Sequence, residues 1–311
     1  MATCLVTGGA GFIGSHLASG LIGEGHQVRV LDNFSSGTRR NLEGLALEII
    51  EGDIRDQALV AQAVAGVDWI FHHAGYISAP KSVEQPLECY SSNVSGSLNI
   101  LEAAREARVS AVVLASSAAI YGQVTQPAHE TQPGAPLTPY AASKLAMEEA
   151  ARLYYELYGL ATVCLRYFNV YGPKQDPQSP YAAAIPLFID AYSRNQHPVI
   201  FGDGTQSRDF VFVEDVFSAN RAAVEQTEAH GEVINIAGGV AVTIGALLEQ
   251  IAAFFTDGKQ PKYEPARPGD PVFSQADISK ATRVLEYRPK VGLEQGLEAT
   301  VQWFRSQKTD K

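Results

Sequence analysis

Cysteines, long apolar runs and basic residues are scarce in this sequence of 311 residues. Its three cysteines, Cys4, Cys89 and Cys164, lie in apolar segments and lack the spacing of a metal-binding motif. This pattern excludes a disulfide scaffold and a cysteine-based metal site, and it predicts buried free thiols in a reducing compartment. No run approaches the ~18 consecutive apolar residues that suggest a membrane-spanning helix.

Basic residues are also fewer than acidic residues. The chain has 24 Lys and Arg against 34 Asp and Glu, which gives a formal net charge of −10. This balance argues against nucleic acid or an anionic membrane as a partner. No signal-peptide pattern precedes the first predicted strand, so we expect a cytoplasmic protein. No metal site is expected.

Short apolar segments alternate with helical patterns up to about residue 167. The predicted strands lie near residues 2–7, 27–31, 47–51, 68–72, 110–115 and 160–167. This alternation predicts an α/β fold with a doubly wound, mostly parallel sheet. Prolines make 124–139 a predicted loop. Beyond residue 172 the alternation stops, although we expect 210–237 to return to strand–helix–strand and complete the main sheet.

A glycine-rich turn follows the first strand and opens a helix. Gly8, Gly11 and Gly14 give the spacing G-x-x-G-x-x-G. Such a turn lets the backbone approach a pyrophosphate closely and directs a helix N-terminus at its negative charge. Asp32 ends the second strand, where a carboxylate can bind both hydroxyls of an adenosine ribose and repel a 2′-phosphate. The pattern therefore favours NAD over NADP.

Other charged residues lie near this turn. Arg39 and Arg40 are interpreted as solvated loop charges, because Asp32 is better placed to meet the ribose. Asp53 ends the third strand, and two interpretations of it stay open. It is either a partner of the adenine amino group or the N-cap of a helix that begins near Asp56.

Tyr140 and Lys144 stand four residues apart in a predicted helix, so they share one face. A lysine charge ~6 Å from the phenol, at an effective dielectric constant of ~20, contributes about 3 kcal/mol and lowers the tyrosine pKa by roughly 2 units from ~10. An oxidised nicotinamide ring nearby brings the pKa close to neutral. We therefore predict that Tyr140 is a base that takes the proton of a sugar hydroxyl.

Together these motifs resemble the extended short-chain dehydrogenase/reductases, specifically nucleotide-sugar epimerases of the UDP-galactose 4-epimerase type. The resemblance covers nearly the whole chain and also rests on segments 73–75, 116–122 and 165–173. It implies an NAD-binding Rossmann domain of residues 1–171 plus about 209–240. A smaller UDP-sugar-binding domain would comprise about 172–208 plus 241–311. Gly75 departs from the family, which usually has alanine there, and looser packing beside the dinucleotide is expected.

The resemblance implies a catalytic set of Ser117, Tyr140 and Lys144. Ser117 would hydrogen-bond the sugar O4, and Lys144 would hold the nicotinamide ribose. Where sugar-nucleotide dehydratases and UDP-glucuronate decarboxylases have acidic residues, this chain has Ala118 and Ala119, which cannot move a proton. C4 epimerisation through a 4-keto sugar needs only one base and a hydride acceptor, and tightly bound NAD is regenerated in each cycle.

The resemblance also implies the binding residues. Contacts to NAD are expected from Gly8, Gly11, Phe12, Ile13, Gly14, Asp32, Asn33, Asp53, Ile54, Ala74, Asn93, Tyr140, Lys144 and Tyr167. Contacts to the UDP-sugar are expected from Ser78, Ser117, Asn169, Ala183, Val199, Phe201, Arg208, Arg267, Asp270 and Ser274.

Alternatives accompany three of these assignments. Asn93 either orients the active-site backbone or the cofactor, or it is a buried structural amide. Arg208 and Arg267 match the two arginines that grip the pyrophosphate, and the alternative is surface ion pairs with their neighbouring aspartates. Ser116, unlike Ser117, is interpreted as a serine that satisfies local backbone groups.

The choice of sugar rests on two features. Segment 175–186 resembles the UDP-N-acetylglucosamine 4-epimerase branch, and Ser274 stands at the family's gate position, where a small residue admits a 2-N-acetyl group. We expect UDP-glucose, UDP-galactose and their N-acetylamino counterparts as substrates. A UDP-glucuronate 4-epimerase and a non-catalytic NAD-binding regulator are the alternatives. A homodimer is expected through the helices near 87–107 and 139–158.

Overall fold

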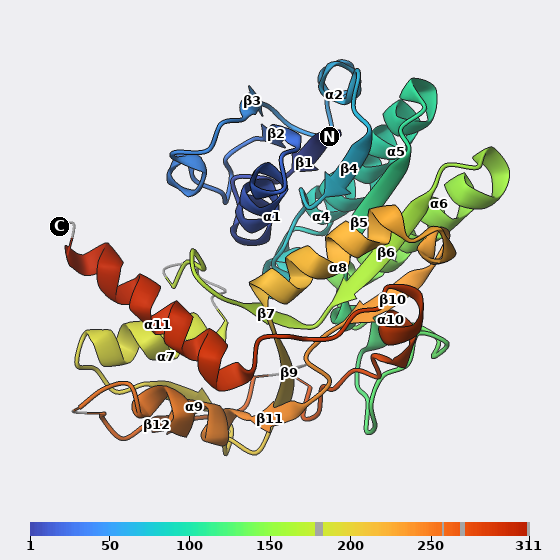
Figure 1. Cartoon of the computed structure of the whole chain (residues 1–311). Helices are drawn as coiled ribbons and strands as arrows, with labels where there is room; N and C mark the ends of the chain where they lie inside the picture. Colours follow the sequence, from blue (N-terminus) through green and yellow to red (C-terminus); the bar gives the residue numbers. More distant parts are fainter. Residues whose placement is uncertain (178–182, 257, 268–270, 310–311) are drawn as a thin grey trace.

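A seven-stranded parallel sheet forms the centre of the computed structural model, which describes residues 1–177, 183–256, 258–267 and 271–309 (Figure 1). Its strand order is β10-β6-β5-β4-β1-β2-β3. The strands are β1 (Thr3–Thr7), β2 (Gln27–Asp32), β3 (Glu48–Glu51), β4 (Trp69–His72), β5 (Ala111–Ser117), β6 (Thr162–Tyr167) and β10 (Val233–Ile236). The predicted doubly wound α/β fold is confirmed.

Helices cover both faces of this sheet (Figure 1). One face packs on α1 (Phe12–Gly23) and α8 (Val213–Glu225) through buried aliphatic side chains. The other face packs on α2 (Gln57–Val64), α5 (Gly96–Ala107) and α6 (Pro139–Tyr158). Between β4 and α5 lie α3 (Ala79–Glu84), α4 (Pro86–Tyr90) and a π-helical turn, Ser91–Ser95. The helix predicted near 87–107 is therefore interrupted by this turn.

The remaining elements surround a separate apolar cluster built from Ile185, Phe188, Leu247, Leu297 and their neighbours. Its strands are β7 (Asn169–Tyr171), β9 (Ser207–Phe212) and β11 (Ala241–Thr243) in one sheet, and β8 (Val199–Phe201) with β12 (Lys262–Glu264) in another. The helices of this region are α7 (Ala184–Ser193), α9 (Ile244–Ala252) and α11 (Leu293–Thr309), and α10 (Ser279–Val284) lies against β10.

One expectation about the main sheet is wrong in part. Of the segment 210–237, only β10 joins the main sheet, whereas β9 pairs with β7 and β11. The apolar alternation that marks a strand does not say which sheet the strand joins. Two other expectations are confirmed. All three cysteines are buried and free, and 122–138 contains no helix or strand beyond one isolated bridge, Ala128–Ala276.

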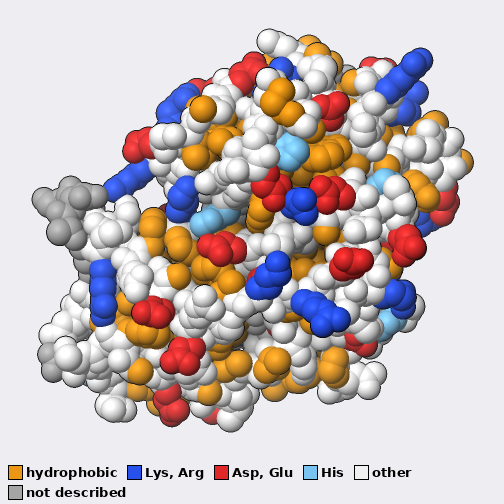
Figure 2. All heavy atoms as spheres, viewed as in Figure 1, with side chains coloured by type: hydrophobic (Ala, Val, Ile, Leu, Met, Phe, Trp, Pro, Cys, Tyr) orange, Lys and Arg blue, Asp and Glu red, His pale blue; other side chains and the backbone are white. Residues whose placement is uncertain are grey.

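The surface carries mixed charge. On the face shown in Figure 2, Lys and Arg side chains are interspersed with Asp and Glu side chains and do not gather into one broad basic area. Within the described part of the chain, no helix is both long and apolar enough to cross a bilayer.

Candidate active site

A cavity of about 710 Å³ lies at the carboxyl ends of the central strands. Because the strands are parallel, the side chains that follow their ends meet at one edge of the sheet. The walls include thirteen of the predicted site residues: Gly8, Gly11, Phe12, Ile13, Gly14, Asp32, Asn33, Asp53, Ile54, Ala74, Ser117, Tyr140 and Lys144. Tyr167 and Ala183 line it as well.

The glycine turn leaves no room for side chains. Gly8 has a φ of +69°, and a Cβ on it would lie 2.6 Å from the backbone N of Ala74. A Cβ on Gly14 would lie 2.2 Å from the Gly8 carbonyl oxygen. No side chain caps α1 at Gly11, and no acidic residue lies in its first turn. The first N–H groups of α1 are therefore available to an anion, which fits the pyrophosphate of a dinucleotide.

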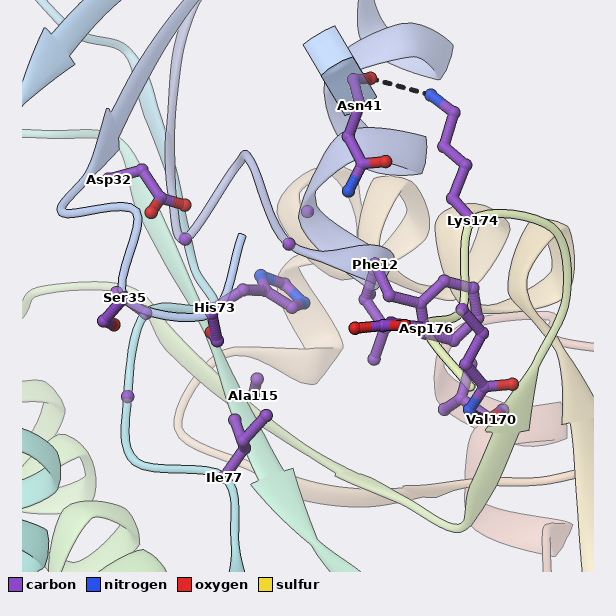
Figure 3. A pocket seen from close by; sticks show the side chains of 18 of the residues that line it. Phe12, Asp32, Ser35, Asn41, His73, Ile77, Ala115, Val170, Lys174 and Asp176 are labelled. Carbon is purple, nitrogen blue, oxygen red and sulfur yellow. Dashed lines mark hydrogen bonds between the residues drawn. The ribbon is translucent and has the colours of Figure 1, made fainter. Parts of the chain in front are cut away.

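Asp32 is held rigidly at the rim of this turn (Figure 3). Its two carboxylate oxygens accept hydrogen bonds from the backbone N–H groups of Ala10, at 2.9 Å, and Phe34, at 2.8 Å. The side chain is 7% exposed and lines the cavity. This placement fits an acceptor for ribose hydroxyls. Arg40 also lines the cavity, whereas Arg39 pairs with Glu51.

The N-cap interpretation of Asp53 is wrong. The N-cap of α2 is Asp56, whose side chain accepts from the backbone N–H of Leu59 at 3.1 Å. The Asp53 carboxylate instead accepts hydrogen bonds from the Arg55 guanidinium, at 2.7 and 2.8 Å, and from the Asn33 amide at 3.0 Å. The hydrogen bond from Arg55 lowers the pKa of Asp53 to about 2. Its contact with adenine stays a prediction.

The start of α6 sets the position of the tyrosine. Thr138 caps the helix by accepting from the backbone N–H of Ala141 at 3.2 Å, and Pro139 opens the first turn. Tyr140 follows at once, and its phenol hydrogen-bonds the hydroxyl of Ser117 at the end of β5. Lys144, one turn later, donates from Nζ to the carbonyl oxygen of Ala115 at 2.7 Å. The three predicted catalytic side chains therefore converge on one cavity.

The electrostatics of Tyr140 differ from the prediction. Burial raises the pKa of its phenol, and the hydrogen bond from Ser117 opposes this rise without cancelling it. Burial also lowers the pKa of Lys144 to about 8. The expected lowering of the tyrosine pKa by Lys144 is therefore wrong, because loss of hydration at the buried phenol is the largest effect on that pKa and raises it.

A buried hydrogen-bond chain fixes the loop after β4. The His72 ring lies 2.7 Å from the Thr7 hydroxyl at Nδ1 and 2.8 Å from the Ser97 hydroxyl at Nε2. Thr7 accepts from the backbone N–H of Ala74, and Ser97 donates to the backbone oxygen of Asn93. Burial lowers the pKa of His72 to about 3, so the ring stays neutral. Each hydrogen bond in this series therefore keeps the same donor and the same acceptor.

Asn93 lies in the π-helical turn and is 1% exposed. Its amide bonds the backbone of Tyr76 on both sides, accepting from N at 2.6 Å and donating to O at 3.1 Å, and it also donates to the Ser143 hydroxyl. It therefore orients the loop beside α6, and a contact with NAD stays a prediction. A Cβ on Gly75 would lie 2.6 Å from the Asn93 Oδ1, so Gly75 permits close packing and the expected loosening is wrong.

Tyr167 forms part of the cavity wall next to His73. The rings stack with centroids 5.7 Å apart, and the Tyr167 hydroxyl lies 2.9 Å from the His73 Nε2. The Asn220 amide donates to the same hydroxyl at 2.8 Å. Tyr167 is thus a fixed, mostly buried wall that a cofactor ring can pack against.

The other predicted substrate residues that the structure describes lie outside the walls of this cavity. Asn169 donates to the backbone oxygen of Asp209 at 3.1 Å, and Ser78 caps α3. Arg208 donates to the Ser207 oxygen, whereas the Asp209 carboxylate accepts from three backbone N–H groups. The ion-pair alternative for Arg208 with Asp209 is therefore wrong. Asp270 lies outside the described residues.

Strand β8 and Arg267 form a second group. The Arg267 guanidinium lies over the Phe201 ring at 3.8 Å. Pro198 and Gly202 make backbone hydrogen bonds to β12. The backbone groups of Val199 and Phe201 therefore face the other edge of β8, away from β12. Phe201 O accepts there from Gln206, and the contact of this strand with the UDP-sugar stays a prediction. Ser274 is partly buried.

The sequence did not identify several residues of the cavity wall, among them Lys174, Trp303 and Gln307. Lys174 points toward Asn41, which also lines the cavity, and donates to its backbone oxygen at 2.8 Å (Figure 3). The sequence marks Lys174 only by its position directly after the segment 165–173, on which the family resemblance rests. No local pattern connects α11, at the far end of the chain, with a nucleotide site.

The comparisons with known proteins agree with this geometry. Residues 4–237 match the model of the NAD dependent epimerase/dehydratase family. The chain is 38% identical over 311 residues to the UDP-glucose 4-epimerase of Mycolicibacterium smegmatis, covering 97% of this chain and 98% of that protein. It is 35% identical over 321 residues to the UDP-N-acetyl-alpha-D-glucosaminuronate decarboxylase of Bacillus cytotoxicus, covering 99% of each.

A solved structure is also similar. The UDP-N-acetylglucosamine 4-epimerase of Methanobrevibacter ruminantium, in complex with UDP-N-acetylmuramic acid, superposes with a TM-score of 0.94 at 40% identity, over 98% of this chain and 99% of that one. Its likeness covers both the parallel sheet and the smaller region. NAD is the cofactor of this chain, and the glycine turn with Asp32 fits it. The chain belongs to the NAD-dependent epimerase/dehydratase family of extended short-chain dehydrogenase/reductases.

Proposed function

We propose that this chain is a UDP-hexose 4-epimerase, an isomerase that interconverts C4 epimers through a transient 4-keto sugar. One observation carries the proposal. Ser117, Tyr140 and Lys144 converge on the nucleotide cavity, and the two positions after Ser117 are the alanines Ala118 and Ala119. The site therefore offers one proton acceptor and lacks, at those positions, the acid that dehydration or decarboxylation uses.

The chain's own residues supply positioning and proton transfer. When bound, NAD would supply a reversible hydride acceptor for C4 and a positive charge that favours the ionised form of the phenol. Tyr140 takes the proton of the O4 hydroxyl. It returns this proton after the keto sugar has rotated to present its other face. Ser117, hydrogen-bonded to the phenol, holds O4 beside it, and Lys144 holds the nicotinamide ribose.

Overall similarity alone does not select the reaction, because the decarboxylase and the two epimerases compared above are similar to the chain at 35–40% identity. The residues at the reacting centre support epimerisation. A carboxylate next to Ser117 would support dehydration or decarboxylation, and the alanines there provide none.

The substrate side supports a UDP-sugar. We infer that Arg208 and Arg267 bind the diphosphate, where two arginine forks give bidentate contacts in an otherwise acidic protein. Ser274 at the gate position leaves room for a 2-N-acetyl group. UDP-glucose, UDP-galactose, UDP-GlcNAc and UDP-GalNAc are therefore the proposed substrates.

A screen of these four UDP-sugars tests both the reaction and the gate. Wild-type protein with no added NAD should convert each sugar to its C4 epimer, detected by chromatography. Ser274→Tyr should keep conversion of UDP-glucose and UDP-galactose and lose ~100-fold on the N-acetylated pair, because a ring in the gate excludes the acetamido group. A tyrosine variant with full activity on UDP-GlcNAc would disprove the gate.

We also propose a homodimer in the cytoplasm, with a division into NAD-binding and UDP-sugar-binding domains as expected above. Leu87, Leu98, Leu153 and Leu157 are 38–86% exposed on α4, α5 and α6, which suits helices that pack against a second copy. Leu101 is fully buried in the chain's own core and would take no part in that contact.

A further inference from the structure

A buried ion pair lies behind the end of the catalytic strand. Glu148, on α6, and Arg166, on β6, have side chains only 3% and 6% exposed. The guanidinium donates from Nε at 2.8 Å and from Nη2 at 2.7 Å, one bond to each oxygen of the carboxylate. Its plane also lies over the Tyr121 ring at 4.7 Å. Such two-pronged pairs hold both side chains in one geometry.

Ser116 connects this pair to the active site. It precedes Ser117 on β5, is 4% exposed, and stands directly across from Arg166 in the β5–β6 register. Its hydroxyl donates to the Glu148 carboxylate, and the interpretation of Ser116 as a serine bonded to local backbone is therefore wrong. Ser117 is the serine with such a bond, since its Oγ accepts from the backbone N–H of Ala119.

Three successive turns of α6 hold three successive residues of β5. Tyr140, Lys144 and Glu148 follow at intervals of four and share one helix face. The Tyr140 phenol bonds Ser117, the Lys144 ammonium bonds the Ala115 oxygen, and the Glu148 carboxylate bonds the hydroxyl between them. The proposed mechanism uses Ser117, Tyr140 and Lys144, and it gives no role to the contact between Glu148 and Ser116.

Arg166 stays charged although it is buried. Burial lowers the pKa of Arg166, but the hydrogen bonds and the charge of Glu148 outweigh this effect, and the pKa is raised overall. Glu148 and Arg166 also line a second cavity of about 260 Å³, separate from the nucleotide cavity that Ser116 lines. Arg166 Nη1 has no hydrogen-bond partner among the described residues, so water in this cavity would complete its bonds.

We propose that Glu148 is a positioning residue of the epimerase site: through Ser116 it fixes the end of β5, and with it the Ser117 hydroxyl, against Tyr140. Arg166 fixes Glu148 in turn, so the ion pair acts on the reaction without touching the sugar. This inference rests on the proposed 4-epimerase function. It concerns how the Ser117 hydroxyl is held beside Tyr140 rather than which residues react.

Ser116→Ala tests the tether and leaves the ion pair intact. We expect kcat to fall ~10- to 100-fold with KM for the UDP-sugar changed less than ~2-fold, because only the alignment at the reacting atoms is lost. The acid limb of the kcat–pH profile should move to higher pH, since the Ser117 hydrogen bond lowers the pKa of Tyr140 and its loosening removes that effect. NAD content should stay at the wild-type value, and the melting temperature should fall only by the few degrees that correspond to the loss of one buried hydrogen bond.

The double variant Glu148→Leu/Arg166→Met removes the partner of the Ser116 hydroxyl instead of the hydroxyl itself. It replaces both charged groups by apolar groups, a change that proteins with buried ion pairs often tolerate. Replacing only one of them would leave the other charge buried without a partner. We expect a folded, NAD-containing protein with the kinetic defect of Ser116→Ala. Glu149→Gln is the matched control, because the Glu149 side chain is 59% exposed on the same helix, and it should behave as wild type.

The outcomes separate this inference from the proposed function. Wild-type kcat and an unmoved pH profile in Ser116→Ala and the double variant would overturn the positioning role and leave the epimerase proposal standing. A loss of activity that only follows loss of NAD or of melting temperature would assign the network to stability, and it would overturn the proposal as well. A wild-type protein that converts no UDP-hexose would overturn both.

Discussion

Tyr140→Phe should lower the epimerase kcat by ~10²- to 10⁴-fold, the range by which a positioned general base accelerates proton transfer. The substitution removes only the phenolic oxygen, which the structure places in hydrogen-bond contact with Ser117 in the nucleotide cavity. NAD should stay bound, because the glycine turn and Asp32 lie on other elements. Steady-state kinetics with UDP-galactose and the absorbance of released NAD measure both effects.

Tyr155→Phe is the matched control for this experiment. Tyr155 lies on the same helix, α6, is 40% exposed and does not line the cavity. Its variant should keep activity within ~2-fold, as surface substitutions usually do. If Tyr140→Phe retained the activity of the control, another group would have to take the O4 proton, and the proposed role of Tyr140 would be wrong.

Gly14→Ala should yield a protein largely free of NAD. The added Cβ would lie 2.2 Å from the Gly8 carbonyl oxygen, a backbone atom in the turn that would face the pyrophosphate. The turn has to open to accept it, and a cost of about 3 kcal/mol corresponds to NAD binding weaker by ~100-fold. Dinucleotide content after purification, followed by titration with NAD, gives the change in affinity.

Gly23→Ala provides the comparison on the same helix. A Cβ at Gly23, the last residue of α1, meets nothing within 4 Å. This variant should keep its NAD and gain up to about 1 kcal/mol of stability, since alanine favours the helical conformation. Equal NAD content in the two variants would show that the turn does not hold the pyrophosphate.

Local motifs account for what could be predicted from the sequence. The glycine turn, Asp32 and the tyrosine–lysine pair are short patterns whose residues need only a strand end or a helix face to come together. The parallel sheet then brings them to one edge, and the structure places all of them around one cavity. Their individual roles in binding and catalysis stay predictions.

Features that depend on packing were not predictable. The pKa of Tyr140 is raised by burial, and burial is a property of the whole site rather than of the four-residue spacing. The partner of Ser116 is Glu148, thirty-two positions along the chain, and nothing near Ser116 marks that contact. Lys174 and Trp303 reach the cavity through the arrangement of the second region. In each case the deciding neighbour is distant in sequence.

The fate of the C4 hydrogen tests the central claim most directly. UDP-galactose carrying deuterium at C4 should be converted, without added NAD, to UDP-glucose that keeps the deuterium at C4, as measured by mass spectrometry and NMR. Retention is expected because the hydrogen leaves and returns within the closed site while Tyr140 moves only the hydroxyl proton. Product that has exchanged its C4 label with water would contradict the account, since it would mean that the hydrogen leaves as a proton.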